Sequence, residues 1–254
     1  MEDWSDAQEI VNGIPEELWS LPSEVMNDYL SAHPDVKAKV LEFLKINFPA
    51  RYFVPNVGQE KAILPLKTMD ISADEMKVGC FAGGNGTGKT TLIPIIMVGA
   101  IWGKGELSSF FEGWSVFDKF QMIQKEERRP LMIRIVCDGV QMKDDGGLFS
   151  EIKKWFPKGR VAWQKDKASF YQSGVVRASS DKNSPVLAKI QVRTFEQDAR
   201  VHAGDNVDLI LVNEPMPKHL YGENIGRLRT RHGGIFWMFA TPLAEGSWIK
   251  DKIA

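Results

Sequence analysis

A glycine-rich run in the first half of the chain has the residue types and the spacing of a phosphate-binding loop. It matches the pattern G-x-x-x-x-G-K-[ST] at every position. The residues assigned to nucleotide binding here are Gly83, Gly84, Asn85, Gly86, Thr87, Gly88, Lys89, Thr90 and Thr91. Glycines allow backbone N–H groups to turn inward around an anion at the start of a helix. Lys89 would bring a positive charge to the β- and γ-phosphates, and the Thr90 hydroxyl would ligate Mg²⁺.

The alternative for this run is a glycine-rich turn that contains an incidental lysine. The surrounding sequence favours the phosphate loop, because residues 78–82 are typical of a strand that enters it. An apolar stretch with helical character follows the loop, as the motif requires. A nucleotide site is therefore the first prediction.

Residues 208–215 form a second candidate segment, in which an apolar run ends in a polar pair. Hydrolysis needs a carboxylate near the phosphates, and Glu214 is the candidate general base. Asn213 stands before it where an aspartate is common, and it lacks the charge that helps to hold Mg²⁺. We assign Thr90 and Asn213 to the metal, and weak metal binding, slow turnover or an altered sequence would each be consistent with Asn213. The alternative is that Glu214 is an exposed acid at a strand end.

Residues 53–59 precede the loop and offer groups that could hold a nucleotide base. The Phe53 ring could stack on the base or the sugar. The Gln59 amide could form a pair of hydrogen bonds with N6 and N7 of adenine. Gln59 could equally lie on the surface of a helix.

A third apolar run, residues 235–239, ends in Ala240, Thr241 and Pro242. A threonine at such a strand end can sense the γ-phosphate and pass the change to neighbouring elements. We therefore predict that these three residues couple the nucleotide to movement.

The elements that must position these residues are short apolar strands that alternate with helices from about residue 51 onward. This pattern predicts an α/β fold with a mostly parallel central sheet covered by helices on both faces. The expected strands are residues 78–82, 131–137, 188–194, 209–212 and 235–239. The expected helices are residues 89–101 and 147–155. The more polar stretch 158–193 is expected to carry a hairpin.

Residues 1–50 are expected to form a separate segment of short helices, which would be a lid or an appendage to a core at 51–254. The helical stretches are residues 15–19, 23–32 and 35–46, with Ser23 and Asp35 as N-caps. The sequence does not decide whether this segment packs on the core.

The composition, with 43% hydrophobic and 26% charged residues in 254, is that of an ordinary globular protein. The longest apolar stretch covers 11 residues, too short for a bilayer, and the acidic N-terminus lacks the order of a secretory signal. Cys80 and Cys137 lie in apolar runs and are expected to be reduced core residues of an intracellular protein.

The net charge of −1 conceals a division between an acidic start and a basic body. Residues 1–36 hold nine acids and no Lys or Arg, so the rest carries a charge of +8. A body of that charge could approach nucleic acid. The strongest local cluster is Lys153, Lys154, Lys158, Arg160, Lys165 and Lys167, interleaved with Trp155, Phe156 and Trp163. A solvated helix followed by a hairpin explains the same residues.

Taken in order, four of these segments resemble the ATPase domain of the large terminase subunit of tailed bacteriophages. The matching stretches are residues 53–59, 83–91, 208–215 and 239–243, and residues 220–229 are also similar. The resemblance covers about residues 50–250, and the ordered set is far more specific than the phosphate loop alone. It implies a P-loop NTPase of the ASCE type.

The resemblance implies a motor that binds ATP and Mg²⁺ and drives double-stranded DNA into a preformed capsid in the host cytoplasm. Its partners would be the DNA, the portal protein, the small terminase subunit and further copies of itself in a ring, commonly of five. No membrane contact is implied. By the same analogy Phe53 and Gln59 lie at adenine, Glu214 activates water, and residues 240–242 couple hydrolysis to movement.

The sequence departs from the family at Gly86 and Asn213, and at its end. Many terminases carry an arginine in the loop, where this chain has Gly86, so the transition-state charge must come from elsewhere. Arg200 of a neighbouring subunit is the first candidate, and Arg227, Arg229 and Arg231 are further candidates. The chain ends soon after the coupling motif, so a nuclease domain would have been removed or would be a separate chain.

Two other functions stay open from the sequence. A helicase-like translocase belongs to the same enzyme class, but its further motifs have no room here. A nucleotide-gated binding or assembly switch with little turnover would suit Asn213. A phosphoryl-transfer kinase is disfavoured, because no arginine-rich acceptor lid is found.

Overall fold

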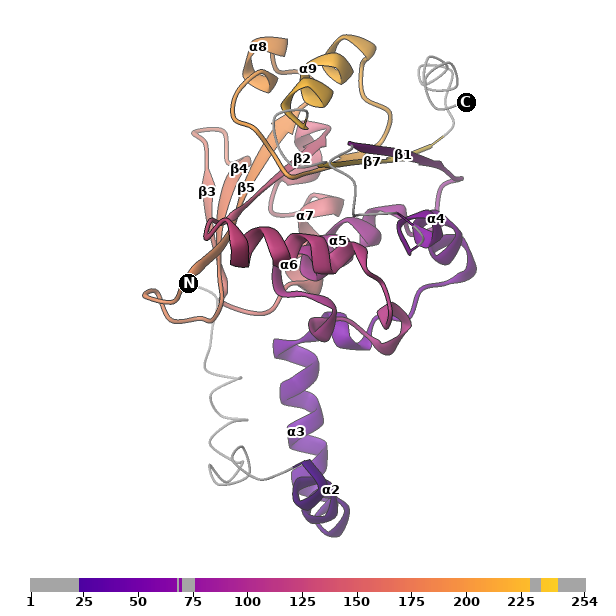
Figure 1. Cartoon of the computed structure of the whole chain (residues 1–254), viewed down its shortest axis with the longest axis vertical. Helices are drawn as coiled ribbons and strands as arrows, with labels where there is room; N and C mark the ends of the chain where they lie inside the picture. Colours follow the sequence, from indigo (N-terminus) through magenta and orange to yellow (C-terminus); the bar gives the residue numbers. More distant parts are fainter. Residues whose placement is uncertain (1–22, 68, 70–75, 229–233, 242–254) are drawn as a thin grey trace.

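A seven-stranded sheet forms the centre of the molecule in the computed structural model, which describes residues 23–67, 69, 76–228 and 234–241 (Figure 1). The strand order is β1-β7-β6-β2-β5-β4-β3. The strands are β1 (Lys77–Ala82), β2 (Leu131–Cys137), β3 (Val161–Lys165), β4 (Tyr171–Arg177), β5 (Val186–Thr194), β6 (Leu209–Asn213) and β7 (Ile235–Ala240). The five strands expected from the sequence are all present, and β3 and β4 form the expected hairpin.

The neighbouring strands β1, β7, β6, β2 and β5 all run parallel to one another. The hairpin differs, because β4 runs antiparallel to β5 and β3 runs antiparallel to β4. Strand β7 lies between β1, which leads into the phosphate loop, and β6, which ends in the polar pair. This additional strand between the two is the arrangement of ASCE-type P-loop proteins, so the expected fold class is confirmed. The register places Ala82 opposite Ala240, and Asn213 opposite Phe239. The carboxyl ends of β1, β7 and β6 are therefore level with one another.

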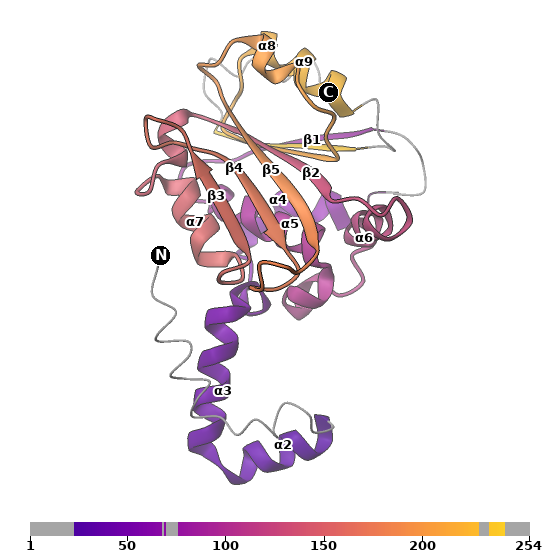
Figure 2. The ribbon, with the colours of Figure 1, turned by 90° about the vertical axis from the view of Figure 1, so that its left-hand side faces the viewer.

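Helices cover both faces of the sheet (Figure 2). Alternate side chains of β2, β6 and β7 enter two different apolar cores, which explains why these strands are nearly continuous apolar runs. One face carries α4 (Val57–Lys67), α5 (Lys89–Trp102), α6 (Val116–Glu126) and α7 (Gly147–Trp155), and the other carries α8 (Ala199–His202) and α9 (Lys218–Leu228). Short 3-10 turns are η2 (Pro49–Tyr52), η3 (Lys104–Glu106), η4 (Ser109–Phe111) and η5 (Gly139–Met142).

Helix α5 is apolar around its whole circumference and is buried along almost its entire length. A helix of this composition is stable only inside a core. It packs between α7, α6 and the sheet. The phosphate loop, which leads directly into α5, is therefore attached to the most deeply buried helix of the domain.

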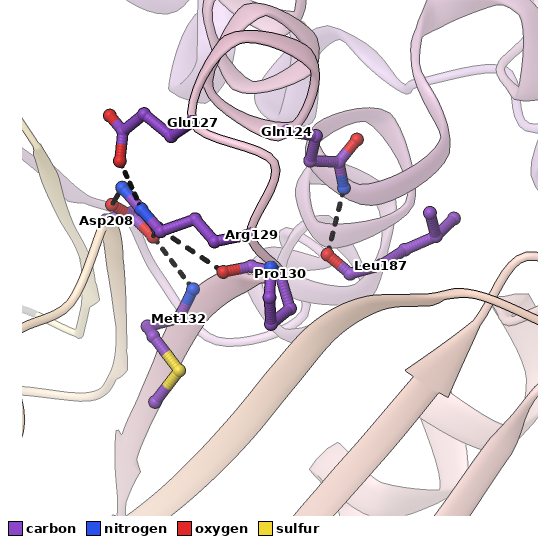
Figure 3. A network of polar contacts seen from close by, with 7 residues as sticks. All are labelled: Gln124, Glu127, Arg129, Pro130, Met132, Leu187 and Asp208. Atoms are coloured by element: carbon purple, nitrogen blue, oxygen red, sulfur yellow. Dashed lines mark hydrogen bonds and ion pairs between the residues drawn. The ribbon is translucent and has the colours of Figure 1, made fainter.

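A network of polar contacts fixes the start of β6, at the amino ends of the parallel strands (Figure 3). The phosphate loop follows the carboxyl end of β1, at the other end of the strands. The Arg129 guanidinium donates to both oxygens of Asp208, at 2.8 and 2.9 Å, and also pairs with Glu127. The Met132 N–H donates to the same buried carboxylate at 2.8 Å. Nearby, the Gln124 side chain donates to the Leu187 carbonyl at 3.0 Å. The strand that ends in Asn213 is thus anchored where it begins.

The N-terminal helices α2 (Ser23–Ala32) and α3 (Pro34–Asn47) project from the body as an arm (Figures 1 and 2). Both match the expected helices, whereas the stretch expected at 15–19 lies outside the described residues. The N-cap predicted at Asp35 is wrong, because α3 begins with Pro34 and has His33 as its N-cap. Proline is favoured at a first helical position, and Asp35 then lies in the first turn, next to the positive end of the helix dipole. The division of the chain at residue 50 stays a prediction.

The two cysteines are free, as expected, and lie on strands β1 and β2, which β7 and β6 separate. Burial raises the pKa of the Cys80 thiol to about 11, and it also raises that of Cys137. Both are therefore protonated at neutral pH and pack as small apolar side chains. Within the described ranges, every helix is too short or too polar to cross a membrane.

Candidate nucleotide-binding and hydrolysis site

The glycine-rich run forms a tight loop between β1 and α5, as the motif predicts. Gly86 and Gly88 adopt left-handed φ angles of 78° and 77°, which glycine adopts without strain. A Cβ added at Gly84 or Gly86 would meet no atom within 4 Å, so both positions face open space. The Gly83 N–H donates to the Ala240 carbonyl at 2.9 Å and ties the loop to β7. The loop therefore has the room and the backbone path of an anion cradle.

The Lys89 ammonium lies inside this loop, and the residue as a whole is only 6% exposed. It donates to the carbonyls of Gly83 and Gly84 at 2.7 and 2.9 Å. These two carbonyl oxygens occupy the acceptor role that phosphate oxygens take in a loaded loop. The ammonium is therefore held inside the loop, and its role at the β- and γ-phosphates stays a prediction.

Gln59 supports the loop from α4, which differs from its predicted role at adenine. Its Nε2 donates to the Gly88 carbonyl at 2.9 Å, and its Oε1 accepts from the Asn56 N–H at 3.0 Å. Asn56 in turn accepts from the Gln59 N–H and reaches the Thr87 carbonyl. Both ends of the amide are thus used by the protein, and the side chain is 7% exposed. In this arrangement Gln59 holds the loop through both ends of its amide.

The stacking role predicted for Phe53 is also corrected by the structure. The ring is 3% exposed and lies in the core. It packs edge-on against Trp155 at 5.2 Å between centroids, and it stacks on Phe111 at 6.3 Å. A base could reach it only if the ring left the core. Phe53 instead anchors the segment that carries Gln59.

Thr90 and Asn213 meet at the start of α5 and the end of β6, as predicted for a metal corner. The Thr90 hydroxyl donates to Asn213 Oδ1 at 3.4 Å. Mg²⁺ prefers oxygen ligands, and a hydroxyl and an amide oxygen that converge here fit that preference. Neither group carries a charge, so the corner is a weaker ligand set than one with an aspartate.

Glu214 and Thr241 were predicted from separate motifs, and the structure brings them together. The Thr241 N–H donates to Glu214 Oε2 at 2.8 Å, and the Thr241 hydroxyl lies 2.9 Å from Oε1. Glu214 has a left-handed φ of 74°, which is uncommon for a residue with a side chain, and its N–H donates to the Phe239 carbonyl. Unusual backbone of this kind often occurs at functional sites. Ala240 ends β7 beside this pair, whereas Pro242 lies outside the described residues.

The sequence did not predict the contacts that Glu151 makes near the loop, nor those of Asn56 described above. The Thr91 hydroxyl donates to Glu151 Oε2 at 2.8 Å, and the Trp155 indole N–H donates to the same oxygen. Glu151 therefore joins α7 to the first turn of α5. Neither Glu151 nor Asn56 belongs to a phosphate-binding motif, and each is linked to the loop through the fold.

Arg200 is exposed on the short helix α8, on the face of the sheet that carries α9. Its backbone N–H donates to the capping carboxylate of Asp198. None of the contacts among the described residues brings its side chain to the phosphate loop of the same chain. Arg227 donates to the Gly204 carbonyl at 3.3 Å, whereas Arg229 and Arg231 lie outside the described residues.

A buried polar network fixes α8 and α9 on the sheet. Arg134 of β2 is fully buried and donates to Gln191 Oε1, to Asn224 Oδ1 and to the His202 carbonyl. Asn224 also contacts His202 Nδ1 at 3.0 Å. Burial lowers the pKa of Arg134 to about 10 and lowers that of His202 below its usual value. At neutral pH the network thus holds a charged arginine and a neutral histidine.

The basic segment predicted to grip DNA divides in the structure. Part of it lines a cavity of about 490 Å³ between α7 and the β3–β4 hairpin. The cavity residues that are basic or aromatic are Lys153, Lys158, Lys165, Phe149, Phe156, Trp163 and Tyr171. Lys165 is neutralised there by Asp144 at 2.6 Å. Arg160 lies over the rings of Phe48 and Trp102, so its guanidinium is partly used in packing.

Comparison with known proteins finds similarity among solved structures. No family model matches the sequence, and no curated protein matches it. The large terminase of the thermophilic bacteriophage D6E is 9% identical with a TM-score of 0.48, covering 79% of this chain and 42% of that one. The large terminase ATPase domain of Thermus phage P74-26 is 11% identical with a TM-score of 0.42, covering 80% and 69%. The D6E terminase in complex with ATP-γ-S is 11% identical with a TM-score of 0.41, covering 74% and 38%.

Proposed function

We propose that this chain is an ATP-hydrolysing motor domain that drives double-stranded DNA into a viral capsid, as part of a large terminase. The observation that carries the proposal is the meeting of three chemical parts at the carboxyl ends of β1, β6 and β7. These parts are a cation inside an anion cradle, a pair of oxygen ligands, and a carboxylate (Lys89, the Thr90–Asn213 pair, and Glu214). The order of the motifs along the sequence supports a terminase over other P-loop proteins.

In the proposed reaction the loop binds the triphosphate, and Lys89 exchanges its two carbonyl partners for phosphate oxygens. Glu214 accepts a proton from a water molecule, whose oxygen bonds to the γ-phosphorus while the bond to the departing ADP oxygen breaks. Thr90 and Asn213 would hold Mg²⁺, which supplies neutralisation of the phosphate charge when bound. The lack of an arginine in the loop implies help from a second copy, with Arg200 as the first candidate.

The proposed motor acts as a ring of identical subunits, with five as the expected number, on the portal protein and with the small terminase subunit. This assembly would act in the host cytoplasm. An exposed Arg200, away from the loop of its own chain, suits a residue that serves a neighbour. A motor of this kind grips the phosphate backbone and does not need to recognise base sequence.

The cavity between α7 and the hairpin is the proposed place for a DNA contact. Lys153 and Lys158 lie at its wall, and Lys154 is exposed beside it on α7. We expect affinity for duplex DNA to fall steeply with salt, because phosphate contacts release counterions. Replacing both Lys153 and Lys154 by Glu should weaken binding and flatten the salt dependence, whereas Lys182→Glu on the exposed β4–β5 turn should change little. Equal effects of the two charge reversals would contradict this location.

The test of the proposed function is steady-state ATP hydrolysis, with and without linear duplex DNA, by the native chain and Glu214→Gln. We expect DNA-stimulated turnover that falls by about 10²–10⁴-fold in Glu214→Gln, because the general base is lost. Glu112→Gln, on an exposed turn, is the matched control and should retain turnover. The assay must include high protein concentration, because an isolated subunit would lack a neighbour's arginine. Turnover that survives Glu214→Gln would refute the assignment of the base.

A nucleotide-gated switch is the second candidate function, and the neutral metal corner at Asn213 is the observation that favours it. Such a protein would bind ATP through the same loop and turn it over little. Undetectable hydrolysis under all conditions, with ATP binding intact, would support the switch over the motor.

A further inference from the structure

The cavity between α7 and the β3–β4 hairpin has a wall of aromatic rings, which contact with a DNA backbone alone does not require (Figure 2). Phe149 is the buried part of this wall, and its ring stacks on Tyr171 at 3.5 Å between centroids. The Trp163 ring stands at a steep angle to both, with centroid distances of 5.3 and 5.9 Å. Trp163 and Tyr171 are partly exposed, so the cavity presents aromatic surface to a ligand.

The same cavity is positively charged. Its charged lining residues are three lysines and one aspartate, Lys153, Lys158, Lys165 and Asp144, which leaves two positive charges. The aspartate is used by the hairpin, because it pairs with Lys165 at 2.6 Å and accepts a hydrogen bond from the Tyr171 hydroxyl. Lys158 is exposed, and none of the ion pairs among the described residues involves it. An anion that enters the cavity therefore meets cations that the protein has not neutralised.

The size of the cavity argues against duplex DNA as the group that fills it. Its volume of about 490 Å³ is that of a site for a small ligand. A duplex is far too wide to enter this space, and its bases are stacked inside the helix, out of reach of the rings. One unpaired nucleotide offers both groups that the lining suits, a flat base for the rings and a phosphate for the lysines.

The alternative is that these rings only pack the hairpin onto α7. Gly174 lies opposite Trp163 on β4, and a Cβ added there would lie 3.0 Å from the indole ring, so Trp163 does cover the hairpin on one side. Packing normally closes the space around apolar side chains and leaves few voids. Here a space of ligand size stays open beside Trp163 and Tyr171, with an excess of lysines around it. Packing alone does not account for that combination.

We propose that this cavity binds one unpaired nucleotide at the end of a DNA strand, with its base against Trp163 and its phosphate at Lys158; this rests on the proposed function. Lys153 and Lys154 then contact the backbone of the duplex that follows. Every base has a flat face on which an aromatic ring can stack, so such a site accepts any sequence. The cavity would therefore hold the end of the DNA more tightly than its interior.

The experiment measures affinity by fluorescence anisotropy for three DNA probes that share one short duplex. The first probe is blunt, the second carries a tail of unpaired thymidines, and the third carries a tail of equal length without bases. Each tail is placed on either strand in turn, and the tighter of the two is compared. We expect the thymidine tail to raise affinity about five- to a hundredfold over the blunt duplex, because one stacked base contributes this much. The tail without bases should lose most of this gain, since it has the phosphates but nothing that stacks.

Variants of the protein locate the site. Trp163→Ala and Lys158→Glu should each remove most of the preference for the thymidine tail, whereas Trp163→Phe keeps an aromatic ring and should retain most of it. Tyr221→Ala removes a partly exposed ring from α9, on the other face of the sheet, and should leave the preference unchanged. Lys182→Glu is the control for charge reversal, on the exposed β4–β5 turn.

The outcomes separate this inference from the proposed function. Equal affinity for the blunt and tailed probes, or for the two kinds of tail, would overturn the inference and leave the duplex contact intact. So would a preference for the thymidine tail that survives Lys158→Glu, a change of an exposed side chain that does not disturb the core. No binding of any probe, with ATP binding intact, would overturn the proposed action on DNA and this inference with it.

Discussion

The role of Gln59 can be decided by replacing its amide with a carboxylate of the same shape. In Gln59→Glu, an oxygen stands 2.9 Å from the Gly88 carbonyl in place of the donor that bonds to it now. The change removes a buried hydrogen bond and sets two acceptors against each other, which costs about 1–3 kcal/mol of loop stability. Since about 1.4 kcal/mol is a factor of ten, we expect affinity for phosphates to fall between about fivefold and a hundredfold.

The assay is calorimetric titration of the variant with ATP, GTP and inorganic triphosphate. A residue that braces the loop acts on the phosphate site, so all three affinities should fall by a similar factor. Gln164→Glu makes the same chemical change on the exposed hairpin, where its oxygen still accepts from Ser173, and should leave all three unchanged. A loss confined to ATP, with GTP and triphosphate unaffected, would refute the bracing role and restore Gln59 to the adenine.

Three further predictions concern stability. Gly79→Ala should lower the free energy of unfolding by about 1–3 kcal/mol in urea titration, because its new methyl would lie 2.0 Å from the Trp237 ring. Its control is Gly222→Ala in α9, where the new methyl meets nothing within 4 Å. This variant should raise the free energy of unfolding by about 0.5–1 kcal/mol. Burial is the main reason that the pKa of His202 is lower in the folded state than in the unfolded chain. As the pH falls, the unfolded chain therefore binds a proton at this histidine before the folded protein does. The contribution of neutral His202 to the free energy of unfolding should be complete above about pH 6.5 and should decrease as the pH falls from there toward the lowered pKa. Urea titrations at several pH values should show this slope, and His202→Gln should flatten it, while an unchanged slope would contradict the assignment. Asp208→Asn should cost about 1–3 kcal/mol in the same titration, because it weakens the pair with Arg129; a change below about 0.5 kcal/mol would contradict this.

The sequence predicts the strands well because each is a short apolar run with a clear break at both ends. The five expected strands differ from the observed ones by no more than two residues at either end. Helices α4, α6 and α9 were not among the expected elements. Two of them contain residues that weaken a helical pattern, Pro65 in α4 and Gly222 in α9, and packing against the sheet makes them helical in spite of this.

The site could be predicted where a motif carries its own chemistry. Lys89 lies in its loop and the Thr90–Asn213 contact is present because each motif ends a strand or begins a helix, and the carboxyl ends of parallel strands meet at one edge of the sheet. The contact between Thr241 and Glu214 depends on β7 lying between β1 and β6. No local pattern in the sequence specifies that strand order, so this contact could not be predicted from the motifs alone.

The two corrected residues, Phe53 and Gln59, show where residue type misleads. An aromatic ring and an amide before a phosphate loop suit a base by their chemistry alone. Their sequence position does not show whether the protein core buries the ring or a backbone carbonyl accepts the hydrogen bond of the amide. In this fold the Phe111 and Trp155 rings bury Phe53, and the Gly88 carbonyl binds Gln59. Competition between a ligand and the protein's own groups can be judged only from the arrangement in space.

The metal site proposed at Thr90 and Asn213 is uncharged, and this has a consequence for the order in which ligands bind. Thr90 and Asn213 offer two uncharged oxygens, and the nearby Glu214 carboxylate is held by Thr241. Two neutral ligands cannot dehydrate Mg²⁺ to a useful extent, so most of the binding energy must come from the charged phosphates. Metal and triphosphate should therefore bind together, and the metal alone should bind very weakly. Asn213→Asp would add a fixed charge at the corner, so metal affinity measured without nucleotide should rise in that variant, and an unchanged affinity would show that Asn213 does not face the metal.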